Sequence, residues 1–171
     1  MKKINSAVIG LGRIGYTYDT GNQTTRTHVG QIIKNKHFRL IAACDSDSTK
    51  IEQIKTDGKV NVPTYSDFKS MLDCNEIELL ILAVNNAEQK KIIDYSLSKN
   101  IKNFIVEKPF LKNNDEIADV LNRVASVHGK IYVNYPRTWD HEFLSDFKNS
   151  LTEKIQHINA FISGNFKENA C

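Results

Sequence analysis

Three glycines close to the N-terminus follow a short apolar run and are spaced to hold a phosphate group. The run "INSAVIG" ends at Gly10, and Gly12 and Gly15 follow it in "GLGRIG". In a strand-to-helix turn, the first glycine permits the tight bend, the second lets the backbone approach a pyrophosphate, and the third lets strand and helix pack closely. The N–H groups of Arg13 and Ile14 would point at the phosphates, aided by the dipole of the helix expected after Gly12. We therefore expect these five residues to bind a dinucleotide.

An aspartate at the end of the next apolar run would complete such a site. Asp45 closes "FRLIAACD", where an acid can bond both hydroxyls of a ribose. The acid usually follows the loop by about 20 residues, whereas Asp45 lies 30 residues after Gly15. We expect the polar residues 19–27 to take up the excess as a loop. Asp45 would repel a 2′-phosphate, and neither Ser46 nor Asp47 offers a positive charge, so NAD is predicted in preference to NADP.

Two other interpretations of the glycine loop remain open from these residues alone. A plain strand-to-helix turn with a surface aspartate needs no ligand. A methyltransferase fold also combines a glycine loop with an acid, so the loop does not fix the cofactor.

Strand and helix patterns alternate about six times along the chain. This alternation predicts an α/β fold with a doubly wound parallel sheet of the Rossmann NAD(P)-binding type. Several runs are apolar on both faces, as strands of a buried parallel sheet should be. The strands are expected at 4–10, 38–45, 60–65, 77–84, 103–107 and 130–135, and the helices at 27–35, 48–58, 66–72, 87–100 and 114–129.

The last residues form a separate pattern. We expect a dinucleotide-binding domain over residues 1–139 and, over 140–171, a linking helix and the first strand of an incomplete second α/β domain. A lone strand near 155–166 would expose an unpaired edge. It is expected either to begin a missing domain or to pair with another molecule, which favours a homo-oligomer.

Composition excludes several classes of protein. The formal net charge is +3 and is not gathered into a basic stripe, so nucleic acid is not expected as a partner. No apolar run reaches the roughly 20 residues that span a bilayer, so no membrane is expected. The three cysteines are far apart and show neither metal-ligand spacing nor a disulfide framework. These features predict a cytoplasmic protein without a metal site.

A second motif lies at the end of the fifth predicted strand. Glu107, Lys108 and Pro109 fall in "VEKPF", at the sheet edge where ligands of open α/β folds bind. The three residues resemble the E-K-P motif of the glucose-fructose oxidoreductase/inositol dehydrogenase/MocA (Gfo/Idh/MocA) family. The stretch "VNYPRTWD" at 133–140 resembles the N-Y-P-R-R-W-D segment of one branch of that family. Together with "GLGRIG" and "IAACD", the motifs occur in the family's order over nearly the whole chain.

The resemblance implies an N-terminal NAD(P)-binding Rossmann domain and a C-terminal α/β domain. Typical members transfer a hydride between the nicotinamide and a hydroxyl or keto carbon of a sugar, sugar nucleotide or cyclitol. Lys108 matches the catalytic lysine that contacts the reacting oxygen. Glu107 would orient Lys108 or bond the nicotinamide ribose, and Pro109 would fix the turn, where a cis bond is possible. Asn134 and Arg137 would contact the substrate.

The sequence departs from the family pattern at three places. In the family's T-P-x-x-x-H element, Asn85 stands near the proline position and Gln89 replaces the histidine. Backbone contacts of Asn85 to the nicotinamide ribose could survive, but packing of the loop would change. Thr138 replaces a common second arginine, and no D-x-x-x-H element follows residue 139. His28 lies near a position where relatives carry a histidine, although a surface helix residue is an equal alternative.

These features favour the cofactor domain of an NAD(P)-dependent oxidoreductase of sugar-type substrates, inactive as this chain alone. The alternative is a non-catalytic NAD-binding module, since hydride transfer needs a substrate pocket. A methyltransferase is disfavoured by the E-K-P motif.

Overall fold

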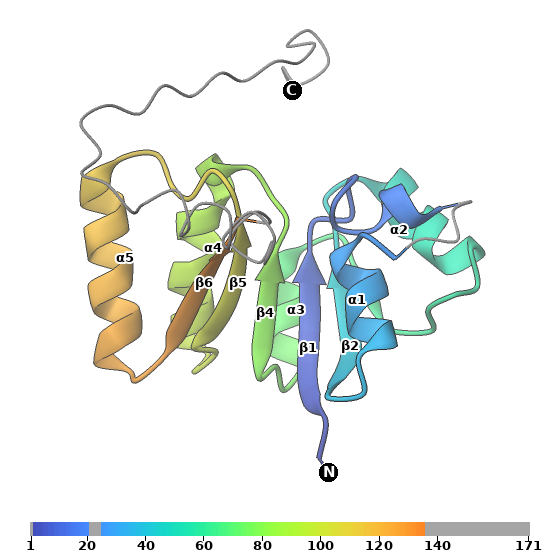
Figure 1. Cartoon of the computed structure of the whole chain (residues 1–171), viewed down its shortest axis with the longest axis horizontal. Coiled ribbons are helices and arrows are strands. Elements are labelled where there is room, and N and C mark those ends of the chain that lie inside the picture. The colour runs from blue at the N-terminus through green and yellow to red at the C-terminus, as the bar shows by residue number, and fades with distance from the viewer. Residues whose placement is uncertain (1, 21–24, 136–171) are drawn as a thin grey trace, which may run out of the picture. The chain divides into compact units, whose positions relative to one another are not determined.

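Six parallel strands form one sheet in the computed structural model, which describes residues 2–20 and 25–135. The order β3-β2-β1-β4-β5-β6 (Figure 1) confirms the predicted doubly wound parallel sheet. The expected helix and strand of 140–171 lie outside the described residues. The strands are β1 Ile4–Ile9, β2 Phe38–Cys44, β3 Thr64–Tyr65, β4 Leu79–Leu82, β5 Asn103–Glu107 and β6 Lys130–Asn134.

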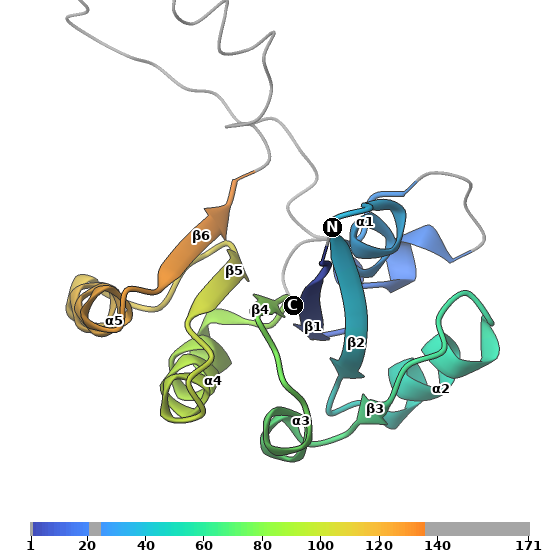
Figure 2. The ribbon, with the colours of Figure 1, turned by 90° about the horizontal axis from the view of Figure 1, so that it is seen from below.

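The helices cover the two faces of the sheet unequally. Figure 2 shows α1 and α2 on one face and α3, α4 and α5 on the other. The smaller core, under α1 and α2, includes Val29, Ile32 and Ile54, and the larger one includes residues from each of the other three helices. None of the described helices is long and apolar enough to cross a membrane. The helices are α1 His28–Lys34, α2 Ser48–Thr56, α3 Phe68–Cys74, α4 Asn86–Ser98 and α5 Asn114–Ser126, with a short 3-10 turn, η1, at Thr17–Asp19.

Alternate residues of the strands feed these two cores. Ala7 and Ile9 of β1 pack into the larger core, while Val8 between them packs into the smaller one. The same alternation places Leu80 and Ile81 of β4 on opposite faces. A sheet covered on both faces is the arrangement that near-continuous apolar strands require.

The first helix lies where the sequence pattern predicted it, since α1 runs from His28 to Lys34 within the expected range 27–35. The helix expected to follow Gly12 is therefore separated from the glycine loop by an inserted segment. The N–H of His28 donates to the Ile14 carbonyl at 3.0 Å, and the N–H of Val29 donates to the Gly15 carbonyl at 3.1 Å. Each bond joins residues fourteen apart, ten more than the four of an α-helix. The hydrogen bonds at the start of α1 therefore skip an inserted segment of about ten residues. This length accounts for the 30 residues between Gly15 and Asp45, where about 20 are usual.

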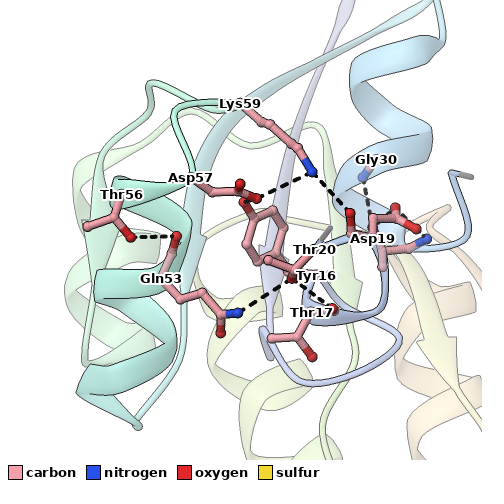
Figure 3. A network of polar contacts seen from close by, with 10 residues as sticks. Tyr16, Thr17, Asp19, Thr20, Gly30, Gln53, Thr56, Asp57 and Lys59 are labelled. Carbon is pink, nitrogen blue, oxygen red and sulfur yellow. Dashed lines mark hydrogen bonds and ion pairs between the residues drawn. The ribbon is translucent and has the colours of Figure 1, made fainter. Parts of the chain in front are cut away.

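Side chains tie this insertion to the end of α2 (Figure 3). The hydroxyl of Tyr16 donates to the Asp57 carboxylate at 2.5 Å. Lys59 lies 3.5 Å from the same carboxylate and donates to the Asp19 carbonyl at 3.0 Å. Gln53 of α2 reaches the Thr20 hydroxyl at 3.5 Å. The first residues of the inserted segment are thus held by α2 and the residues directly after it.

The other end of the insertion is held by the Asp19 carboxylate. It accepts the N–H of Arg26 at 2.7 Å, and the N–H and hydroxyl of Thr27 at 3.0 and 2.6 Å. Burial raises the pKa of Asp19, but the hydrogen bonds from Thr27 and Arg26 outweigh it, and the pKa lies below its usual value. Thr27 in turn caps α1 by accepting the Gly30 N–H. Asp19 therefore fixes where α1 starts.

Replacing Tyr16 by phenylalanine should lower the free energy of unfolding by about 1–3 kcal/mol, because a hydrogen bond to a charged group is lost. Burial, and then the bond to Asp57, raise the pKa of Tyr16 above its ordinary 10.0. Stability from this group is therefore complete below pH 10 and declines as pH rises above it, where the unfolded chain releases the proton. Urea unfolding at pH 7 and above pH 10 measures both effects. Tyr132→Phe, at an exposed strand position, is the control, and equal losses in the two variants would contradict the prediction.

Candidate functional site

The carboxyl ends of the central strands surround a crevice. Strand β1 pairs with β2 on one side and β4 on the other, so the chain connections depart in opposite directions from β1. Ligands of open α/β sheets bind at such a switch point. A cavity of about 270 Å³ lies here. Its lining residues are Ile9, Gly10, Cys44, Asp45, Ser46, Ser66, Asp67, Phe68, Val84, Glu88, Lys91 and Ile92.

The three glycines of the loop have different surroundings. Gly10 has a φ of +96°, and a Cβ there would overlap with the Ala83 carbonyl oxygen. A Cβ on Gly15 would overlap with the Gly10 carbonyl oxygen. A Cβ on Gly12 would meet no atom within 4 Å. Gly10 and Gly15 are therefore required by the protein itself, while Gly12 leaves open space of the kind a close phosphate would occupy.

Asp45 holds the glycine loop as well as lining the cavity. Its Oδ2 accepts the N–H of Leu11 at 2.7 Å, and its Oδ1 accepts the N–H of Asp47 at 2.9 Å. The residue is only 8% exposed. A carboxylate has about four acceptor positions, so Asp45 can take ribose hydroxyls in addition to these bonds. The predicted ribose acid is therefore also the anchor of the loop.

A lysine that the sequence reasoning overlooked lies beside this acid. The Nζ of Lys50 is 3.6 Å from the Asp45 carboxylate and 3.8 Å from that of Asp47. The spacing in the sequence could have predicted its contact with Asp47, because Lys50 follows Asp47 by three residues at the start of α2 and such pairs lie on the same helix face. The part of the crevice near Asp45, where a ribose is predicted, thus carries two carboxylates and one ammonium group.

The remaining residues of the predicted nucleotide loop face outward. The Arg13 guanidinium lies 4.8 Å from the centre of the Tyr18 ring and donates to its hydroxyl at 3.0 Å. Ile14 is 38% exposed. Helix α1 begins only at His28, so it does not follow Gly12 directly. The chain after Gly12 instead forms a turn, which is closed by a hydrogen bond from the Tyr16 N–H to the Gly12 carbonyl. The N–H groups of Arg13 and Ile14 belong to this turn.

Glu107 joins three elements at the end of β5. Its Oε1 accepts the Asn134 amide of β6 at 2.6 Å and lies 2.8 Å from Nε2 of His28. Burial raises the pKa of Glu107, but the hydrogen bonds from His28 and Asn134 outweigh it and hold the pKa below its ordinary value. An ionised carboxylate only accepts hydrogen bonds, so His28 presents its proton on Nε2.

This carboxylate bears on two expectations. His28, with a side chain only 14% exposed, is not a surface helix residue. Asn134 donates to Glu107, because paired strands β5 and β6 place the two residues side by side, and its expected contact with substrate stays a prediction. Arg137, the other expected substrate residue, lies outside the part of the chain that the structure describes.

The turn after β5 presents the candidate catalytic lysine. The peptide bond between Lys108 and Pro109 is cis, and Lys108 is exposed. Asn85 caps α4 by accepting the Glu88 N–H at 3.2 Å. Gln89, expected to alter loop packing, is fully buried against this turn and bonds to its backbone. Because the strands are parallel, the predicted residues that follow β1, β2, β4 and β5 lie along the same edge of the sheet.

The strand order and the glycine loop after β1 define a domain of the Rossmann class, which binds nucleotides at this edge of the sheet. Residues 4–135 match the Gfo/Idh/MocA family, described as an oxidoreductase family with an NAD-binding Rossmann fold. The chain belongs to this family, as the E-K-P resemblance implied.

Solved structures share the fold at low sequence identity. The WlbA dehydrogenase from Bordetella pertussis, solved with NADH and UDP-GlcNAcA, aligns at a TM-score of 0.73 and 15% identity, covering 88% of this chain and 42% of that one. Scyllo-inositol dehydrogenase from Lactobacillus casei, with bound NAD(H) and scyllo-inositol, aligns at 0.70 and 20%, covering 87% and 42%. Myo-inositol 2-dehydrogenase from Lactobacillus plantarum aligns at 0.68 and 21%, covering 87% and 41%.

A second group of relatives is found by sequence among curated proteins. The redox-sensing transcriptional repressor Rex of Listeria welshimeri is 26% identical over 106 residues, 61% of this chain and 43% of that protein. The same extent of similarity is found for Rex of Listeria innocua. The chain thus spans well under half the length of these relatives.

Replacing Gly15 by alanine should lower the free energy of unfolding by about 2–3 kcal/mol, within the range for steric overlap in a packed site. The new methyl group would collide with backbone that cannot move freely. Gly12→Ala is the matched control and should change stability by less than about 0.5 kcal/mol. Chemical denaturation of both variants measures the difference, and a tolerated Gly15→Ala would show that the loop is looser than described.

Glu107→Gln should reduce stability at pH 7 by about 1 kcal/mol, because bonds to a charged acceptor become bonds to a neutral one. Since the folded pKa is depressed, the wild-type carboxylate stabilises fully above its ordinary pKa of 4.5, and this stability is lost as pH falls through the folded value. The variant should therefore lose less stability on acidification. Glu52→Gln, on an exposed position of α2, is the control. Parallel acid profiles for wild type and Glu107→Gln would refute the assignment.

Proposed function

We propose that this chain is the cofactor domain of an enzyme that transfers a hydride between NAD(H) and a hydroxyl or keto carbon of a sugar, sugar nucleotide or cyclitol. The observation that carries the proposal is that Gly12 and Lys108 follow parallel strands of one sheet and so lie at the same edge of it. Gly12 leaves open space where a pyrophosphate would lie, and Lys108 stands exposed on the turn after β5. Family membership and the bound sugar-type ligands of the structural relatives support the substrate class.

The residues present fit a dinucleotide. N–H groups of the turn at Arg13 and Ile14 would bind the pyrophosphate, and Asp45 would accept the ribose hydroxyls while still holding Leu11. When bound, the nicotinamide supplies or accepts the hydride. Lys108 donates a hydrogen bond to the reacting oxygen and stabilises the negative charge that develops there.

Charge at the ribose end favours NAD(H) over NADP(H). Asp45 and Asp47 carry two negative charges, and Lys50 offsets one of them. A 2′-phosphate would therefore enter a region of net negative charge. Lys50 limits this penalty, so its removal should sharpen the preference for NADH.

A non-catalytic NAD-binding module is the second candidate. It is favoured by the sequence similarity to proteins named as redox-sensing repressors. In this function the crevice and the glycine loop act as above, but Lys108 has no reacting oxygen to contact. Because this chain alone is expected to be inactive, turnover of polyols, sugars and sugar nucleotides with NAD or NADH separates the two functions when it is measured with a second α/β domain supplied.

The full chain should bind NADH, and Gly12→Val should abolish binding without unfolding, because the side chain fills the space of the pyrophosphate. Lys108→Ala should leave the Kd for NADH nearly unchanged, because its partner is the substrate oxygen. Fluorescence titration measures binding, and circular dichroism confirms folding.

Two outcomes would contradict these assignments. Retained binding by Gly12→Val would move the pyrophosphate away from this loop. A large loss of NADH affinity in Lys108→Ala would make Lys108 a cofactor-binding residue. Titration with NADPH, in wild type and in Lys50→Met, tests the charge argument separately, and tighter binding of NADPH than NADH would overturn it.

A further inference from the structure

Gln89 is a fully buried polar side chain in the first turns of α4. Its Nε2 donates to the Glu107 carbonyl at 2.9 Å and to the Pro109 carbonyl at 3.2 Å, and it lies 3.4 Å from the Val84 carbonyl. Its Oε1 accepts the N–H of Leu111 at 2.9 Å. One side chain thus bonds to the backbone of the turn on both sides of Lys108.

The turn depends on this side chain for its polar partners. Leu111 is buried and has a φ of +54°, and its N–H takes the Gln89 side chain as partner rather than a backbone carbonyl of a strand or helix. A buried N–H or carbonyl without a partner costs about 1–3 kcal/mol. Asn86 of α4 adds a bond from its amide to the Leu111 carbonyl at 3.1 Å. The start of α4 therefore provides donors and an acceptor that the turn itself lacks.

We propose that Gln89 is a positioning residue that sets Lys108 at the cofactor crevice. The catalytic role of Lys108 in this inference rests on the proposed function. The hydrogen bonds by which Gln89 holds the turn do not depend on it. Gln89 does not reach the reacting atoms and acts through the backbone at 107, 109 and 111. Lys108 is left exposed while its neighbours are fixed, which is the arrangement that a reactive amine in a defined place requires.

The chemistry of the amide suits this task. A primary amide offers two N–H donors and a carbonyl acceptor at the same time and carries no charge at any ordinary pH. A carboxylate only accepts, so glutamate would face the carbonyls of Glu107 and Pro109 without a hydrogen. A histidine could donate to one carbonyl and accept from Leu111 only while neutral, and would lose the second bond on protonation.

The test compares Gln89→Leu, Gln89→Glu and Gln89→His with wild type, and with Gln31→Leu, an exposed glutamine, as the matched control. Acetylation of Lys108 by acetic anhydride is followed by mass spectrometry with and without NADH. In wild type and Gln31→Leu, NADH should slow the labelling. In Gln89→Leu and Gln89→Glu, NADH should still bind through the glycine loop but no longer slow it.

Gln89→His supplies a pH profile that a merely structural role would not produce. Protection of Lys108 by NADH should be retained at about pH 8 and lost at about pH 6, where an imidazole becomes protonated and labelling of the lysine is still measurable with excess reagent. Wild type should show no such loss. If a substrate is found, kcat should fall about 100-fold in Gln89→Leu with a much smaller change in KM, as expected for a misplaced catalytic group.

Each outcome decides one question. If NADH protects Lys108 equally in wild type and in the Gln89 variants, Gln89 does not position it. If Gln89→Leu fails to fold, the pH profile of Gln89→His still decides. If NADH fails to protect Lys108 even in wild type, the proposed function fails at this residue. Amide hydrogen exchange at Leu111, which should quicken in Gln89→Leu and not in Gln31→Leu, then tests the contact itself, and unchanged exchange would overturn it.

Discussion

The close approach of three backbone segments at Gly10 is the constraint on which the site depends. The Gly10 N–H bonds to the Cys44 carbonyl at 2.8 Å, and the Ala83 N–H bonds to the Ile9 carbonyl at 2.8 Å. Strand β1 is thereby joined at its last residues to both neighbours. A Cβ on Gly10 would overlap with the Ala83 carbonyl oxygen, so only glycine lets the end of β1 lie this close to the residues that follow β4. Gly10 lines the base of the crevice together with Asp45 and Val84.

Two acidic side chains near the crevice hold parts of the fold together through hydrogen bonds, independently of any ligand. The Asp45 carboxylate fixes the glycine loop, and the Glu107 carboxylate joins α1, β5 and β6 through His28 and Asn134. Both groups are buried and both lie at strand ends. Substituting either one would therefore disturb geometry as well as binding, which is why the experiments above use Gly12 and Lys108 to test the cofactor and its chemistry.

The sequence predicted the parallel sheet, the glycine loop and the turn at Lys108, because each depends on local spacing and apolar pattern. Strand limits were predicted too widely at β3, where pairing begins only at Thr64, and at β4, where the strand covers only Leu79–Leu82 of the apolar run. The contact between His28 and Glu107 spans 79 residues, and no periodic pattern reports such a pair. The role of Gln89 was hidden for the same reason, since a buried glutamine and an exposed one look identical in a sequence. The range of α1 was predicted from its apolar pattern, but the hydrogen bonds that join its first residues to Ile14 and Gly15 were not.

That insertion gives the domain a natural grafting point. Because His28 and Val29 bond back to Ile14 and Gly15, the two ends of the inserted segment emerge from adjacent turns of one ladder. Within it, Tyr16 packs in the smaller core and the Asp19 carboxylate holds Arg26 and Thr27, so both ends of the segment are tied to the domain. A reporter peptide spliced between Thr20 and Thr25 would leave these contacts in place, whereas one spliced nearer to Gly15 would break them.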